Sequence, residues 1–146
     1  MVRIWLLCGA VLALPGAVIV AAESGAMPVP TSSVFDLMQT AIVPASDTLW
    51  GIENPQTDAE WQVFVDAAQM LVDAGQSLRA GGTGPGDAAW AASPDWQAFV
   101  DRLIAASEAA KAAAENRDLE GMFSAGDVLY PPCEECHLQF NPGVQQ

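Results

Sequence analysis

Three kinds of residue are scarce in this chain of 146 residues: histidine, cysteine and the basic side chains. There is one histidine, there are three cysteines, and five Lys and Arg residues face 18 Asp and Glu residues. The formal net charge of −13 repels phosphate backbones and anionic headgroups. It therefore excludes nucleic acids and membrane surfaces as expected partners, and any charged protein partner is expected to be basic.

Sequence patterns typical of β-strands are scarce as well. Valine is the main β-branched apolar residue, and many of the valines lie before residue 35 or near predicted turns. The chain is 51% hydrophobic and rich in alanine, which is a strong helix former. These features predict a single all-α domain, because a chain of this length is sufficient for one hydrophobic core.

Residues 1–22 have the pattern of a secretory signal peptide. Arg3 precedes an apolar run over 4–20, and small residues follow it. We expect cleavage before Glu23, and thus a periplasmic protein with no membrane attachment after cleavage. An uncleaved membrane anchor is the alternative, but Pro15 interrupts the run and no cationic stop follows it.

Four helices are predicted from the spacing of apolar residues and from capping residues. Each begins at a capping residue, namely Ser33, Thr57, Ser93 and Asp118. Asp36 and Glu60 complete capping boxes with the first two of these caps. The expected helices cover about 33–50, 57–79 and 93–116, and a last one runs from 118 towards the C-terminal cysteines.

Prolines predict breaks in two of these helices. Pro44 lies inside the first helix, which must kink or restart there. Pro131 and Pro132 lie inside the last apolar pattern. We therefore expect the last long helix to end near Leu129 and a short new helix to start at about Pro132.

Mostly short connections predict an antiparallel, up-down-up-down four-helix bundle. The exception is the Gly-rich segment 80–92, which is expected to be a flexible connection. The bundle is expected over residues 33–141, between an N-terminal tail at 23–32 and a C-terminal tail at 142–146.

The segment PPCEECHLQF, residues 131–140, holds two cysteines three residues apart and the single histidine. The third cysteine, Cys8, is expected to be lost with the signal peptide. A zinc site would need about four ligands, and only three residues are at hand. A redox dithiol is typical of a βαβ context, which the sequence does not predict. A structural disulfide would close a very small loop and would leave the histidine unexplained.

Covalent haem accounts for all three residues of the motif. Thiols at positions i and i+3 can reach the two vinyl groups on one porphyrin edge, and the imidazole of the next residue then falls under the iron. Cys-x-x-Cys-His is the known attachment signature. We expect one haem c per chain, held by Cys133 and Cys136, with His137 as an axial ligand. Because its single histidine is committed to iron, the chain is not expected to be an enzyme. A single histidine also excludes bis-histidine ligation of the iron.

A sixth iron ligand must then be a methionine upstream, or the site is open to water or gas. Met38 lies one turn into the first helix, level with the end of the last helix in an antiparallel bundle. Met122 is too far from His137, about 22 Å along a helix, and Met70 is about 14 Å off level. We expect Met38 to be the ligand, although a methionine on an apolar stripe is commonly core filler.

Residues 31–141 resemble the class II cytochromes c, the cytochrome c′ family. The resemblance rests on the motif, on Asp95-Trp96, and on the stretches MQTAIVPASDTLW and NRDLEGMFSAGDVLYPPCEECHLQF. It implies a haem inside a four-helix bundle with His137 as the proximal ligand. Low-spin members take a methionine from the first helix and carry electrons, which implies redox partner proteins. High-spin members leave the iron open and bind small gases, which is the alternative. A monomer and a homodimer are both compatible with it.

Few cations are available for the two haem propionates. Arg79 closes the second helix, level with the expected haem, and is the candidate. Arg102 is expected to lie far from the haem, and Lys111 and Arg117 are not both expected near it, because Arg117 lies at the turn before the last helix. Arg79 could equally complement the dipole of its own helix.

Overall fold

The computed structural model describes residues 30–141 and residue 143, and this part of the chain is all-helical. The predicted all-α class is therefore confirmed. The predicted signal peptide, most of the N-terminal tail and most of the C-terminal tail lie outside the described residues. Among the described helices, none combines the length and the hydropathy needed to cross a membrane.

The helices follow the predicted order closely. The first predicted helix is built from three consecutive segments: α1 (Val34–Leu37), a π-helical segment η1 (Met38–Ile42), and α2 (Val43–Trp50). They are followed by α3 (Asp58–Ala80), the short α4 (Asp87–Ala91), α5 (Pro94–Glu115) and α6 (Leu119–Phe140).

The predicted caps are mostly confirmed. The hydroxyls of Ser33 and Thr57 accept the backbone N–H three residues on, and the carboxylates at those positions bond back to the caps, so both capping boxes form. The Asp118 side chain accepts the N–H of Gly121 at the start of α6. Ser93 is at the N-cap of α5, but its side chain makes no capping hydrogen bond.

The proline in the first helix is accommodated by a wider turn just before it. The N–H of Val43 donates to the carbonyl of Met38, five residues back, which is the π-helical pattern. Pro44 is then the second residue of α2, and the carbonyls that its missing N–H could have met belong to the exposed residues Gln39 and Thr40. The predicted restart therefore takes the form of a π turn, and the chain stays helical from Val34 to Trp50.

The predicted break in the last helix is wrong. The helix α6 continues through Pro131 and Pro132 to Phe140. The two prolines leave the carbonyls of Asp127 and Val128 without helical donors, but both residues are exposed, so water can replace the missing bonds. Pro132 itself is buried, and its contacts offset part of the cost.

The connection over 80–92 is more ordered than a flexible loop. Residues 87–91 form α4, and Asp87 is buried with 3% of its surface exposed. Its Oδ2 accepts the N–H of Val34 at 2.9 Å and the N–H of Gly84 at 2.8 Å. This carboxylate ties the connection to the first turn of α1, so it positions the beginning of the first helix.

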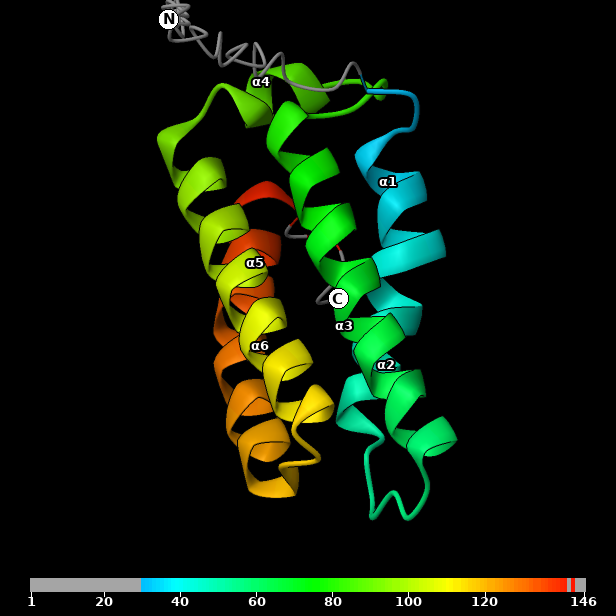
Figure 1. The fold of residues 1–146 in the computed structure, drawn as a ribbon. Helices are drawn as coiled ribbons and strands as arrows, with labels where there is room; N and C mark the ends of the chain where they lie inside the picture. The colour runs from blue at the N-terminus through cyan, green and yellow to red at the C-terminus, as the bar shows by residue number, and fades with distance from the viewer. Residues whose placement is uncertain (1–29, 142, 144–146) are drawn as a thin grey trace, which may run out of the picture.

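The helices pack side by side (Figure 1). The core between them is rich in alanine. The most extensive contacts between helices join α3 to α5 and α5 to α6, while α2 packs against α3 and also touches α6. At Gly75 in α3 an added methyl group would lie 2.6 Å from Cγ1 of Ile104 in α5, so this helix pair approaches closely. Residues 34–50 and the end of α6 contribute side chains to the same region of the molecule.

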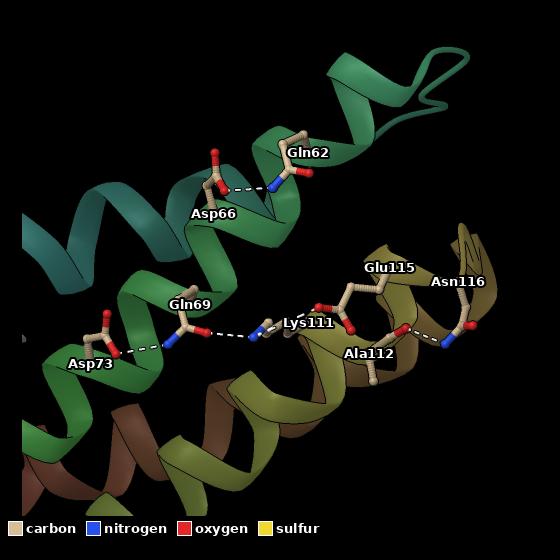
Figure 2. Close-up of polar contacts among 8 residues, drawn as sticks. All are labelled: Gln62, Asp66, Gln69, Asp73, Lys111, Ala112, Glu115 and Asn116. Carbon is tan, nitrogen blue, oxygen red and sulfur yellow. Dashed lines mark hydrogen bonds and ion pairs between the residues drawn. The ribbon is translucent and has the colours of Figure 1, made fainter.

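A polar cluster on the surface adds a second link between α3 and α5. Figure 2 shows Lys111 donating to Oε1 of Gln69 at 2.7 Å, while Gln69 donates to Asp73 at 2.9 Å. The Lys111 ammonium also lies 3.8 Å from the carboxylate of Glu115. Lys111 is thus engaged between α3 and α5.

Candidate cofactor site

The cysteine motif opens onto an apolar cavity that lies between residues 34–50, α5 and α6. It encloses about 680 Å³ of empty space, part of it continuous with solvent. The cavity lies among residues that are far apart in sequence: Met38, Ile42, Val43, Ser46, Asp47, Trp50, Leu78, Trp96, Phe99, Val100, Leu103, Pro132, Cys133, Cys136 and His137. We call it the first cavity. The predicted thiols, the imidazole and the predicted methionine are therefore brought together.

A second cavity adjoins the first and faces the end of α6. It encloses about 950 Å³ of empty space, again including open solvent. The two cavities share five lining residues: Met38, Val43, Trp96, Cys136 and His137. The second cavity also reaches Phe35, Trp90 and Phe140. Cofactor sites are commonly apolar clefts with a few polar groups, and the two cavities have that character.

The three residues of the motif lie on one face of α6. Residues three and four apart on a helix are neighbours, so His137 lies one turn from Cys133 and directly after Cys136. All three are partly buried and line the first cavity. An apolar cavity with two thiols and an imidazole along one wall fits a haem bound through two thioethers. The residues present therefore fit the group that the motif implies.

Burial makes these thiols poor nucleophiles. It raises the pKa of Cys133 to about 11, and burial together with the neighbouring Cys133 raises the pKa of Cys136 to about 11. Redox-active dithiols instead have a lowered pKa, because the thiolate is the reactive form. The structure thus gives the redox-dithiol alternative no support. In the described part of the chain, no group of three or more His, Cys, Asp or Glu residues is placed to hold a metal, so the structure gives the zinc alternative no support.

Met38 lines the same two cavities as the residues of the cysteine motif. It is half-buried, belongs to the π-helical segment and lines both cavities together with His137. Irregular π turns are frequent at functional sites. Met70 is 45% exposed and Met122 is buried in the core, and neither lines the two cavities. The choice of Met38 among the methionines agrees with the structure, while ligation itself stays a prediction.

An aromatic cluster closes the end of the site. Trp90 stacks on Trp96 with ring centroids 5.8 Å apart, and Phe140 packs edge-on against Trp96 at 5.2 Å. The indole N–H of Trp96 donates to the carbonyl of Leu78 at 2.8 Å, which fixes the buried ring. Phe99 extends the cluster to Phe140 at 6.3 Å. Only Asp95-Trp96 was recognised from the sequence, because the cluster joins α4, α5 and α6 and no local pattern links them.

Arg79 is placed at the end of α3, as predicted, but its guanidinium is paired. It lies 2.6 Å from Oδ1 of Asp101, and it is not among the residues that line the two cavities. Its basic side chain is also in the last turn of α3, where it complements the helix dipole. A role for Arg79 at a propionate stays a prediction.

Arg102 is nearer the motif than the sequence analysis expected. Its guanidinium lies 2.6 Å from Oε2 of Glu135, which stands between the two cysteines, and 5.2 Å from the ring centre of Phe99. The expectation that Arg102 lies away from the site is therefore wrong. The physical reason is the chain direction: α3 ends and α5 begins at the same end of the molecule, so the second turn of α5 lies beside the last turns of α6. The pairing lowers the pKa of Glu135 and raises that of Arg102, mainly through their mutual hydrogen bond.

One buried polar atom in the site lacks a partner. Ser46 in α2 is 3% exposed and lines the first cavity. Its hydroxyl makes no hydrogen bond in the part of the chain that the structure describes. No sequence pattern marks Ser46, apart from its place on the same predicted helix as Met38.

Searches with protein-family models, among curated proteins and among solved structures found nothing that matches this chain.

Proposed function

We propose that this chain is a periplasmic c-type cytochrome that holds one covalent haem and transfers single electrons. The observation that carries the proposal is the meeting of Cys133, Cys136, His137 and Met38 around one apolar cavity. A chance Cys-x-x-Cys-His sequence gives no reason for an apolar cavity beside it, or for a methionine from another helix lining that cavity.

The arrangement we propose is an antiparallel, up-down-up-down four-helix bundle. Its four members are the first helical segment (34–50), α3, α5 and α6. The contacts of α3 with α5, of α5 with α6, and of α2 with both α3 and α6 support it. Such a bundle places the start of the first helix and the end of the last at the same end, which is where the site is built. This is the architecture that the resemblance to the cytochrome c′ family implies.

Each residue of the site has a separate role in the proposal. The sulfurs of Cys133 and Cys136 hold the haem by two thioethers, and the imidazole of His137 binds the iron from the α6 side. The thioether of Met38 binds from the first helix. A bound haem supplies a reversible one-electron change at its iron. The aromatic cluster around Trp96 excludes water from one edge of the site.

The partners proposed for the protein are redox proteins with basic docking surfaces. The net charge of −13 supports this proposal, because complementary charge speeds the encounter of electron-transfer partners. Weak, salt-sensitive contacts are typical of such encounters. Export to the periplasm follows from the N-terminal pattern and is part of the same proposal.

A gas-binding module with an open iron is the second candidate. It is favoured by one observation: the empty space of the first cavity extends past Met38 to Ile42, Ser46 and Trp50. In that case Met38 is a packing residue beside the iron. The spin state separates the two candidates, since methionine ligation gives six-coordinate low-spin iron.

The test is expression of the full chain with a haem-maturation system, followed by absorption spectra of the ferric and ferrous protein. The expected result is covalent haem with a low-spin spectrum in both states. Met38→Ala should convert the ferrous form to five-coordinate high spin with rapid uptake of carbon monoxide. Met70→Ala is the matched control, because Met70 is exposed and does not line the site. A chain that acquires no covalent haem refutes the proposal. A wild-type ferrous spectrum that is already five-coordinate and high-spin assigns the chain to the second candidate, and a low-spin spectrum that Met38→Ala leaves unchanged removes Met38 as a ligand.

A further inference from the structure

We propose that Ser46 is a haem-site residue whose hydroxyl donates a hydrogen bond to an acceptor atom carried by the bound haem. The inference rests on the proposed function and deepens it, since it adds a polar contact on the wall facing the cysteine motif. The acceptor is either an oxygen of a propionate or an atom of a small molecule bound to the iron. Both are acceptors that a haem brings into an otherwise apolar cavity.

The hydroxyl of Ser46 differs from other helical hydroxyls in this chain. Serine and threonine inside a helix commonly donate to the carbonyl four residues back. Four residues here do so, at 2.7–3.0 Å: Thr40, Thr48, Ser77 and Ser107. Ser46 is as buried as Ser107 within a few per cent, yet it makes no such bond to Ile42. Its hydroxyl therefore remains unpaired, and Ser46 is among the residues that line the first cavity.

Leaving this hydroxyl unpaired is costly. A buried polar group without a hydrogen bond loses its interactions with water and gains nothing in return. Alanine at position 46 would avoid that cost and would favour the helix. A serine there is unfavourable for the chain alone, and it becomes favourable once a hydrogen-bond acceptor enters the cavity.

The lining of the first cavity offers Ser46 few other partners. The indole N–H of Trp96 already donates to Leu78. Asp47 lines the cavity but is exposed to solvent. A buried water needs two to four polar partners, and most of the lining side chains are aliphatic, aromatic or sulfur-containing. The acceptor is thus best supplied by the group that fills the cavity.

The test compares Ser46→Ala with Ser107→Ala, its matched control, in two forms of the full chain. Ser107 is 0% exposed and its hydroxyl is already bonded to Leu103, so its loss should not depend on haem. Urea denaturation is measured for the chain without haem and for the covalent holoprotein. Without haem, Ser46→Ala should raise the folding equilibrium constant, roughly fivefold or more from the relieved desolvation. With haem it should lower that constant, by about two- to tenfold from the lost hydrogen bond.

Vibrational spectra of the holoprotein identify the acceptor. If it is a propionate, Ser46→Ala should shift the propionate bending bands in the resonance Raman spectrum and leave the stretching frequency of bound carbon monoxide unchanged. If it is a molecule on the iron, the carbon monoxide stretching frequency should move and the propionate bands should not. These spectra decide the matter even if the chain without haem does not unfold cooperatively.

The inference is overturned if Ser46→Ala leaves both sets of bands as in the wild-type holoprotein, or if it stabilises the holoprotein and the haem-free chain alike. Ser107→Ala should change neither spectrum. Failure of the proposed function looks different, because the wild-type chain would then carry no covalent haem. The two failures are therefore distinguishable in the same set of samples.

Discussion

Removal of the Asp87 carboxylate should destabilise the protein more than removal of any exposed acidic side chain. Oδ2 of Asp87 accepts two backbone N–H groups, from Val34 at 2.9 Å and from Gly84 at 2.8 Å, and the residue is 3% exposed. Hydrogen bonds to a charged group contribute about 1.5–3 kcal/mol each. Two such bonds give roughly 3–6 kcal/mol, and water entering the vacated space offsets part of this. We expect Asp87→Ala to lower the free energy of unfolding by about 2–4 kcal/mol.

Two further variants separate the hydrogen bonds from the charge. Asp87→Asn keeps an oxygen that can accept both N–H groups, so it should cost less than Asp87→Ala. Asp66→Ala is the control, because Asp66 is exposed and accepts a hydrogen bond from Gln62 on the same helix (Figure 2). A surface change of that kind usually alters stability by about 0.5 kcal/mol or less.

Urea denaturation followed by circular dichroism measures the three variants. Hydrogen exchange should also show faster exchange of the Val34 amide in Asp87→Ala, since that amide loses its acceptor. The reasoning fails if Asp87→Ala is no more destabilising than Asp66→Ala, or if Val34 exchanges at the wild-type rate. Because Val34 begins the helix that carries Met38, the holoprotein of Asp87→Ala should also show a weakened low-spin spectrum.

Two other predictions concern packing and pH. Gly75→Ala gains about 1 kcal/mol of helix propensity, but it places a methyl group 2.6 Å from Cγ1 of Ile104, and overpacking costs about 1–3 kcal/mol. Thermal denaturation should therefore show a net loss of stability. The double variant Gly75→Ala with Ile104→Ala should lose less stability than the two single variants lose in sum. In the chain without haem, burial raises the pKa of the Cys133 and Cys136 thiols to about 11, from an ordinary value of 9.0. The folded form therefore binds these protons more tightly than the unfolded form. The free energy of unfolding should then fall as the pH rises from about 9 to 11. Alkylation by iodoacetamide should accordingly be much slower in the folded chain at pH 8 than in urea, and equal rates would contradict the buried placement of the thiols.

The elements predicted most accurately are those that local sequence determines. Capping boxes at Ser33 and Thr57 are encoded within four residues, and the structure forms both of them. The motif that ends at His137 is also local, which is why its three residues were identified together. The all-α class follows from composition, since alanine-rich segments bounded by caps leave no segment suited to a strand.

The features that the sequence did not predict depend on contacts between distant segments. Asp87 follows four glycines in a segment that resembles a linker, and its buried carboxylate is recognised only when the start of α1 lies beside it. Side chains at Gly82 or Gly84 would overlap that carboxylate, so the glycines there allow a close approach. The continuous α6 was missed because proline penalties are smaller where the orphaned carbonyls can reach water. Arg102 was misplaced by an error in chain direction, although the predicted topology already brought it near the motif.

The π turn at 38–42 also sets the rotational phase of the first helix. A regular α-helix advances about 100° per residue, so Met38 and Ser46 would point roughly 80° apart, and Met38 and Trp50 roughly 120° apart. A π turn takes up one residue more than an α turn, which reduces both separations to about 20°. All three residues accordingly line the first cavity. The π turn therefore contains one residue more than a regular α-helix would need to keep Met38 and Ser46 on the same face. Deleting one residue between Met38 and Val43 would leave Met38 on that face and bring it closer to Ser46 along the helix axis.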